Sequence, residues 1–206
     1  MLTNKEKVIL IEEIEERLGI NLEREQLEYI FNKNKRILFT SPRKYGKDTM
    51  AAVRAIVNSL ATPNRRTAIL AYGQVAVRQV LELLEYISGP LMYNKRVCHP
   101  SRITFDNGSE ILVFNGKEIE QMIGHKVDEV IIQEAFMYNS STLDVIINCS
   151  FASIIHSDDY SISLIGTPNP ISSSVLHNLS TSRIWSTTIV KASEMLNENL
   201  LQKGVI

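Results

Sequence analysis

The sequence is poor in cysteine: only Cys98 and Cys149 occur among its 206 residues. Two cysteines so far apart form neither a metal-binding nor a redox motif, and we expect reduced, partly buried thiols of a cytosolic protein. No metal-ligand spacing joins the four histidines, which are His99, His125, His156 and His177. The sequence therefore gives no indication of a zinc site or a disulfide framework.

Long apolar runs and an excess of one charge are also missing. No run approaches the ~20 apolar residues of a membrane span, and the first residues, Met1 to Lys7, do not have the pattern of a signal peptide. The net charge of −1 gives no overall attraction to DNA. Any nucleic-acid contact would depend on short basic runs such as 34–36 or 64–66, although such runs are usually solvated loops.

What is present fits one folded domain. With 44% hydrophobic and 22% charged residues, the composition excludes a disordered or collagen-like chain. Segments of strand and helix periodicity alternate, which predicts an α/β fold: a mostly parallel central sheet flanked by helices. A β-hairpin insertion is predicted around Asn107-Gly108. We expect helices at 4–18, 22–31, 50–57, 75–87, 143–150, 173–178 and 192–202, and strands at 37–39, 66–72, 102–105, 110–114, 127–135, 160–165 and 184–190. In the first helix, the residues expected to face the domain are Val8, Ile9, Leu10, Ile11 and Ile14.

The segment from Ser41 to Thr49 follows an apolar run and precedes a helical pattern. Strand, tight loop, lysine and helix form the layout of a phosphate-binding P-loop. Backbone N–H groups and the helix dipole favour an anion there, Gly46 lets the backbone approach it, and Lys47 would reach the outer phosphates. The match to G-x-x-x-x-G-K-[ST] is imperfect, because Ser41 replaces the first glycine and Asp48 stands where a hydroxyl normally contacts Mg²⁺.

Two later segments complete the pattern of a nucleotide site. The apolar stretch 127–135 has Glu134 near its carboxyl end. A Walker B strand ends in a similar way, with an acidic residue near the metal and a glutamate that polarises the attacking water. Since ligands of open α/β sheets bind at the carboxyl ends of the strands, Lys47 and Glu134 should face one crevice. A further strand at 160–165 ends in the small, polar turn 166–169.

In this order, the motifs resemble those of the ATPase domain of the large terminase subunit of tailed phages, from about Leu22 to Leu196. The resemblance implies a P-loop NTPase of the RecA/ASCE-like type that uses ATP and Mg²⁺. It implies catalytic roles for Glu134, Arg43 and Lys47, and Arg43 either contacts the γ-phosphate or only braces the loop. Nucleotide binding is implied for Gln26, Ser41, Pro42, Arg43, Lys44, Tyr45, Gly46, Lys47, Asp48 and Thr49. The coupling motif, which links hydrolysis to DNA movement, corresponds to Gly166, Thr167, Pro168 and Asn169. Weaker candidates for an arginine-finger-like role on a neighbouring subunit are Lys126 and Arg183.

The chain departs from the family at two positions. The family normally has Ser or Thr at position 48 and an acidic residue at position 133, whereas this chain has Asp48 and Gln133. One interpretation is a relocated carboxylate, in which Asp48 ligates Mg²⁺ and Gln133 orients Asp48 or a water. The alternatives are that Thr49 supplies the ligand after a small shift, or that the site is damaged. The candidate metal-site residues are thus Asp48, Thr49 and Gln133.

The resemblance also implies partners and an organisation. It implies a DNA-packaging motor that assembles as a homo-oligomeric ring (a monomer in isolation) on a viral portal. Its other partners would be double-stranded DNA and the small terminase subunit, in the cytoplasm of an infected bacterial host and without a membrane. We expect an ATPase domain at 1–195 with a helical lead at 1–33, a linker or C-terminal helix at 196–206, and no nuclease domain. Asp158-Asp159 is expected to be a solvated turn rather than a metal pair.

Two other functions remain open from the sequence. A helicase-like, DNA-dependent ATPase shares the strand, P-loop and acidic strand, but it would need a second RecA-like domain. A nucleotide-binding scaffold without hydrolysis (a pseudo-ATPase) is favoured by Asp48 and Gln133.

Overall fold

The computed structural model describes residues 2–89, 93–96, 100–168 and 173–191. Its α-helices are α1 (Asn4–Leu18), α2 (Arg24–Ile30), α3 (Lys47–Ala61), α4 (Gln74–Ser88), α5 (Ser140–Ile154) and α6 (Ser173–Thr181), and its 3-10 helices are η1 (Gly116–Met122) and η2 (Ala135–Met137). The strands are β1 (Arg36–Thr40), β2 (Arg66–Ala71), β3 (Tyr93–Arg96), β4 (Ser101–Phe105), β5 (Glu110–Asn115), β6 (Glu129–Ile132), β7 (Ser161–Gly166) and β8 (Ser186–Ile189). Within these ranges, no helix has both the length and the apolar character that crossing a bilayer requires.

All the strands join in one sheet with the order β3-β4-β5-β2-β6-β7-β1-β8. The six strands from β5 to β8 in this order are parallel, whereas β3 and β4 pair antiparallel at one end. Strand β7 therefore lies between β1, which leads into the predicted P-loop, and β6, which leads into Glu134. The carboxyl ends of these three strands meet at one edge of the sheet, where ligands of open α/β sheets bind.

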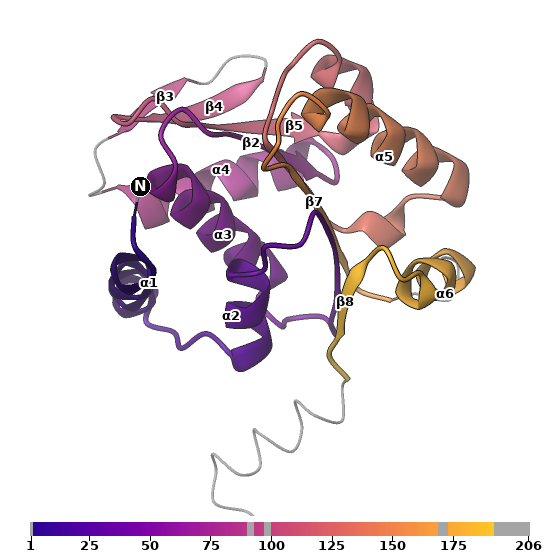
Figure 1. Ribbon diagram of the computed structural model, residues 1–206, viewed down its shortest axis with the longest axis horizontal. Coiled ribbons are helices and arrows are strands. Elements are labelled where there is room, and N and C mark those ends of the chain that lie inside the picture. Colours follow the sequence, from indigo (N-terminus) through magenta and orange to yellow (C-terminus); the bar gives the residue numbers. More distant parts are fainter. Residues whose placement is uncertain (1, 90–92, 97–99, 169–172, 192–206) are drawn as a thin grey trace, which may run out of the picture.

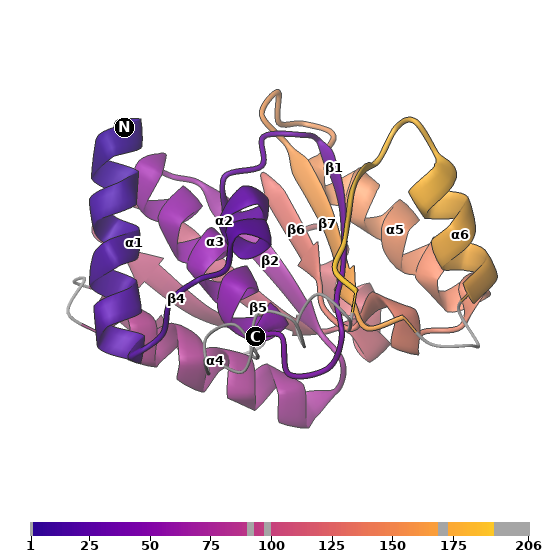
Figure 2. The same ribbon diagram turned by 90° about the horizontal axis from the view of Figure 1, so that it is seen from below.

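The sheet separates two layers of helices. Alternate residues of a strand point to opposite faces, and in β1 Ile37 and Phe39 pack in a core with α1 to α4, whereas Leu38 packs in a second core with α5. Trp185 lies in the second core. Figure 1 shows the two groups of helices, and Figure 2 shows the sheet between them. This burial on both faces explains why the parallel strands are almost continuously apolar.

Most of the predicted elements are present, with three differences. Val8 and Ile9 are 46% and 45% exposed, so the prediction that they face the domain is wrong; only Leu10, Ile11 and Ile14 of that set are buried. The apolar run is longer than the stripe that one helix face can bury. The hairpin turns at Asn107-Gly108 as predicted, but its second strand, β5, pairs with β2 and so extends the sheet. Strand β3 and the 3-10 helices η1 and η2 were not predicted, and β6 ends at Ile132, before the end of the strand predicted at 127–135. The helix expected at 192–202, the segment 196–206, Cys98, His99 and Asn169 lie outside the described residues.

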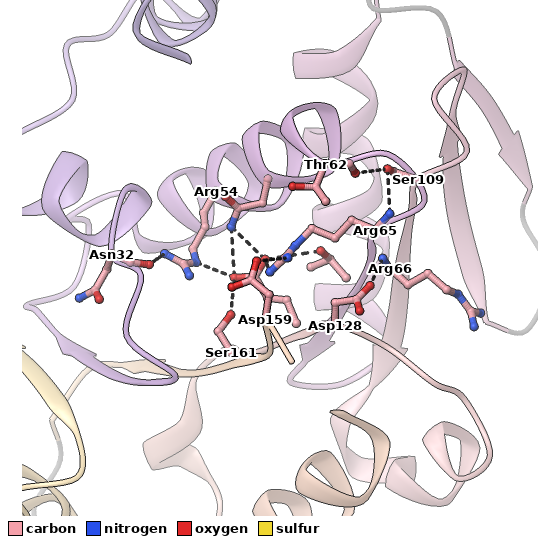
Figure 3. Close-up of polar contacts among 12 residues, drawn as sticks. Asn32, Arg54, Thr62, Arg65, Arg66, Ser109, Asp128, Asp159 and Ser161 are labelled. Carbon is pink, nitrogen blue, oxygen red and sulfur yellow. Dashed lines mark hydrogen bonds and ion pairs between the residues drawn. The ribbon is translucent and has the colours of Figure 1, made fainter. Parts of the chain in front are cut away.

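A buried ion pair joins the P-loop helix to the sheet at its amino edge. Arg54 of α3 is 2% exposed and donates from Nε to Oε1 of Glu129, the fully buried first residue of β6, at 2.7 Å. Arg54 Nη1 also donates to the main-chain oxygens of Tyr29 and Asn32, at 2.6 and 2.9 Å. Figure 3 shows the Arg54 side chain directed toward Asn32 on one side and toward the carboxylate beside Ser161 on the other.

The Glu129 carboxylate is held by further donors. Asn58 Nδ2 lies 3.0 Å from Oε2, Ser161 Oγ lies 3.1 Å from Oε1, and Arg65 Nη2 lies 3.7 Å from Oε2. Burial acts to raise the pKa of Glu129, but Arg54 and Arg65 lower it below its ordinary value. The carboxylate therefore stabilises the fold at pH values above the pKa of the unfolded chain, and this contribution is lost as the pH falls through the folded-state pKa.

Arg65 contradicts the expectation that the run 64–66 is a solvated loop. Its side chain is buried between Glu129 and Asp159, the latter 3.4 Å away. The backbone of Arg65 donates to Ser109 Oγ at 3.1 Å, which ties β2 to the β4–β5 hairpin (Figure 3). Asp159 itself is exposed and lies in a turn, as predicted.

The buried pair predicts a non-additive loss of stability. Arg54→Met or Glu129→Leu alone should each lower the free energy of unfolding by about 3–5 kcal/mol, because the remaining charge is buried without its partner. The double variant should lose less than the sum of the two, and urea unfolding measures all three. The exposed pair Arg24–Glu28 serves as the control, since its removal should change stability by at most about 0.5 kcal/mol. Simple additivity of the Arg54 and Glu129 changes would contradict a coupled buried pair.

Candidate active site

The loop between β1 and α3 has the backbone form of a phosphate-binding loop. Gly46 caps α3 with φ +79° and Lys44 has φ +67°, so two residues of the loop adopt the left-handed conformation. Ser41 N donates to Gly166 O at 3.3 Å, which ties the start of the loop to the end of β7. The free N–H groups of the first turn of α3 therefore face outward from the carboxyl edge of the sheet, where they can bind an anion.

Helix α2 supports the loop from below through Gln26. The buried Gln26 amide donates from Nε2 to Tyr45 O at 2.6 Å and accepts from Glu23 N at 2.7 Å. Tyr45 in turn stacks on Phe39 of β1, with ring centroids 6.1 Å apart. Both ends of the Gln26 amide are thus bound to the backbone, and in this structure Gln26 braces the loop.

Lys47 opens α3 and lies almost wholly buried under the loop. Its Nζ donates to Pro42 O at 3.0 Å, so the ammonium is held at the centre of the loop curve. Burial lowers the pKa of Lys47, whereas the nearby carboxylates of Glu134 and Asp48 act to raise it. An amine that is partly desolvated, close to carboxylates and bonded to a carbonyl can exchange that contact for a phosphate oxygen.

These groups line one cavity of about 980 Å³ at the carboxyl edge of the sheet. Ligand pockets in proteins commonly measure about 300–1,000 Å³, so its size suits a nucleotide. The predicted site residues among its lining are Arg43, Lys44, Gly46, Lys47, Asp48, Thr49, Gln133, Glu134, Thr167 and Pro168. The structure thereby brings together the P-loop, the residues after β6 and the residues after β7.

The candidate metal ligands lie together at this cavity. Gln133 is 3% exposed, and its Nε2 has no hydrogen-bond partner in the part of the chain that the structure describes. Partial burial raises the pKa of Asp48, and Lys47 opposes this shift. Within the described ranges no three His, Cys, Asp or Glu residues gather as a metal centre. A hard cation here would therefore rely on phosphate and water oxygens besides Asp48, Thr49 and Gln133.

Glu134 is positioned by a strained turn. It has φ +47°, an uncommon left-handed conformation for a non-glycine residue, and it directs the chain from β6 into η2. The next residues pack on the end of β7, because a Cβ on Gly166 would lie 2.7 Å from Phe136 Cδ2 and 3.3 Å from Ala135 N. Gly166 thus lies behind the cavity, and its missing side chain lets the turn that carries Glu134 approach β7.

Several lining residues were not predicted from the sequence. Helix α4 and the residue before its cap form one wall, with Tyr72, Ala76, Gln79, Val80 and Leu83, and η2 adds Met137. The only signal for them is position, since α4 follows β2 at the carboxyl edge. Of the predicted nucleotide-binding residues, Gln26, Ser41, Pro42 and Tyr45 support the loop without lining the cavity.

Comparisons with known proteins agree on the fold. No protein-family model matches the sequence, and no curated protein matches it. The solved ATPase domain of the large terminase of Thermus phage P74-26 is similar, with a TM-score of 0.68 at 17% identity over 91% of this chain and 88% of that one. A large terminase from a thermophilic bacteriophage, in complex with ATP-gamma-S, gives 0.65 at 12% identity over 89% and 48%. The large terminase of bacteriophage HK97 gives 0.62 at 11% identity over 93% and 40%. The chain therefore has the fold of the ATPase domains of large terminases.

The close contact between Gly46 and Gln26 predicts a defect specific to the site. A Cβ at Gly46 would lie 3.0 Å from Gln26 Nε2, whereas Gly19, with φ +64°, has nothing within 4 Å of the same position. Gly46→Ala and Gly19→Ala should both lower stability by about 1–2 kcal/mol because both backbones are left-handed. Only Gly46→Ala should weaken ATP binding, measured by calorimetry. Equal nucleotide affinity in the two folded variants would contradict a role of this contact in shaping the loop.

Proposed function

We propose that this chain is the ATP-hydrolysing motor domain of a viral terminase, which drives double-stranded DNA into a procapsid. The observation that carries the proposal is the single cavity at which the P-loop, Glu134 and Thr167 meet. The terminase-like fold supports it independently. A helicase-like ATPase would share the cavity but would need a second RecA-like domain to act on DNA.

In this proposal, the loop binds the phosphates of ATP. The N–H groups at the start of α3 and the Lys47 ammonium would hold the β- and γ-phosphates. Asp48, Thr49 and Gln133 would hold Mg²⁺, which supplies charge neutralisation and orientation of the phosphates when it is bound. The buried Gln133 Nε2 has no partner among the described residues, and a donor at that depth requires an acceptor. This supports a role for Gln133 in orienting the Asp48 carboxylate or a water bound to the metal.

Glu134 would position and activate the attacking water. Its half-buried carboxylate lines the cavity with Lys47 and Arg43, and phosphoryl transfer requires little beyond such positioning and charge stabilisation. Arg43, which is exposed at the mouth of the cavity, would contact the γ-phosphate. Thr167 would respond to the γ-phosphate, and the bond from Ser41 to Gly166 would pass its movement between the loop and β7.

The remaining partners follow from the motor function. The chain would act in a homo-oligomeric ring on a portal, with the small terminase subunit, in the cytoplasm of an infected bacterium. The phage origin of the similar structures supports these assignments.

A second candidate is a scaffold that binds a nucleotide without hydrolysing it. The observation that favours it is the pair of departures at Asp48 and Gln133, which leaves β6 without the usual carboxylate beside Glu134. An ATPase assay on the purified chain, with and without DNA, separates the two candidates. Tight ATP binding without turnover in both conditions would favour the scaffold.

The roles of Lys47 and Glu134 predict opposite kinetic defects. Lys47→Ala should weaken ATP binding by about 10–100-fold, because it removes a charge-assisted contact of about 1.5–3 kcal/mol. Glu134→Gln should bind ATP normally but turn it over about 10²–10⁴-fold more slowly. Calorimetry and a phosphate-release assay measure the two effects, with Glu120→Gln as the matched control at an exposed position. If Glu134→Gln lost binding together with turnover, Glu134 would belong to the structure or the metal site instead.

The relocated carboxylate predicts coupling between positions 48 and 133. Asp48→Ala should weaken ATP binding in Mg²⁺ more than binding in EDTA, since the metal would lose a ligand. Asp48→Thr together with Gln133→Asp should recover Mg²⁺-dependent turnover better than either change alone, because the two residues share one ligand shell. If both single changes were silent and their effects additive, Thr49 or water would be the ligand.

A further inference from the structure

A basic groove lies at the amino edge of the sheet, opposite the nucleotide cavity. It measures about 570 Å³ and lies where β1, β7 and β8 begin. Its lining includes three cations from two distant parts of the chain, Lys35, Arg36 and Arg183, and two aromatic residues, Tyr160 and Trp185. No carboxylate lines the groove in the described part of the chain, whereas the chain as a whole has a net charge of −1.

The charges of these cations are not neutralised by the described residues. Among the described residues, no carboxylate forms an ion pair with Lys35, Arg36 or Arg183. Lys35 Nζ lies 4.4 Å from the ring centroid of Tyr160, and the Arg36 guanidinium lies 4.9 Å from that of Phe151. Cation–π contacts fix the position of a cation and leave its positive charge in place. The neighbouring acidic turn is partly compensated, because Asp159 pairs with Arg65.

The groove is built on ordered backbone. Asn32 Oδ1 accepts from Asn34 N at 2.9 Å and from Asn34 Nδ2 at 2.8 Å, which forms a tight turn before Lys35. Asn32 Nδ2 donates to Ser186 Oγ at 3.1 Å, so the segment before β1 is tied to β8. On the other wall, the turn before β8 is closed by Trp185 N donating to Ser182 O at 3.3 Å, and Trp185 is buried beneath it.

We propose that this groove binds the phosphate backbone of double-stranded DNA. The inference rests on the proposed motor function, which supplies nucleic acid as the partner. Uncompensated Lys and Arg side chains on a concave surface match phosphates, and Ile184, 60% exposed at the same wall, can pack against the sugars. Such contacts carry no base specificity, as a motor that moves along any sequence requires. The groove and the nucleotide cavity occupy opposite edges of the sheet, so both can be filled at once.

The test uses the full 206-residue chain and a fluorescent 30-base-pair duplex of mixed sequence. Binding is measured by anisotropy between about 50 and 200 mM salt. The variants are Lys35→Gln, Arg183→Gln and the double change. The matched control is Lys5→Gln with Arg24→Gln, which removes the same charge from α1 and α2, away from the groove. ATP affinity of Lys35→Gln is measured in parallel.

The groove variants should weaken DNA binding in a salt-dependent way. Each phosphate contact contributes about 0.9 to the slope of log affinity against log salt. At 0.1 M salt, one such contact therefore strengthens DNA binding about eightfold relative to 1 M salt. Each single change should therefore weaken binding several-fold and lower the slope by about 1, and the double change should lower it by about 2. The control should keep the wild-type slope, and Lys35→Gln should keep wild-type ATP affinity.

Other outcomes overturn either the groove proposal or the motor function, and they can be told apart. Equal DNA binding by the groove variants and the control would remove the groove from the DNA surface and leave the motor function standing. Absence of DNA binding by a wild-type chain that binds ATP would have the same effect. Displacement of the duplex by polyglutamate at equal charge concentration would assign the groove to an acidic protein partner. Normal, groove-dependent DNA binding without ATP turnover would instead contradict the motor function and leave the groove in place.

Discussion

The Arg54–Glu129 ion pair is the contact on which the arrangement of the domain depends. Arg54 is on the P-loop helix, Glu129 begins the strand that leads to Glu134, and the same guanidinium binds carbonyls at the end of α2. One side chain therefore fixes the helix, the strand and the element that supports the loop. A buried pair of this kind contributes little net stability over an apolar pair, but it requires one register and one helix orientation.

This fixed amino edge allows strain at the carboxyl edge. Lys44 and Glu134 have left-handed backbones, and the amide of Gln133 is buried without a partner among the described residues. Each of these features costs free energy, and such features persist where the surrounding structure determines the conformation. These three groups line the cavity, whereas Asn64, the other left-handed non-glycine residue of the described chain, lies in the turn before β2. Arg54 is the eighth residue of α3, so about 10 Å of helix separates its ion pair from the loop.

The sequence predicted the parts of the fold and site that depend on local pattern. Strand, loop and helix at Ser41–Thr49, the acidic residue after β6 and the hairpin turn at Asn107-Gly108 are each encoded within a few residues. The assignment of site residues to the cavity followed from a general property of parallel sheets, whose carboxyl ends meet at one edge. Roles of individual residues, such as the metal ligation expected of Asp48, remain predictions.

Contacts between distant segments could not be predicted from local sequence patterns. Charged side chains are rarely buried without partners. The partners of Arg54, Glu129 and Arg65 lie on other elements, so in the sequence these three residues look like surface residues. The wall formed by α4 has no motif, and the contact between Gln26 and Tyr45 O depends on how α2 packs under the loop. The wrong prediction for Val8 and Ile9 has the same cause, because an apolar run does not show which of its residues have a neighbouring element to pack against.

The position of β1 in the sheet has a consequence for the synthesis of the chain. This strand is close to the N-terminus, yet its two neighbours, β7 and β8, are near the other end, and Asn32 is bonded to a residue 154 positions later. While the ribosome makes the intervening segments, both edges of β1 have no strand to pair with. Contacts so distant in sequence form late and slowly, and an unpaired apolar strand is prone to aggregate. The strand that leads into the loop between β1 and α3 can therefore gain both of its neighbours only after β8 has been synthesised.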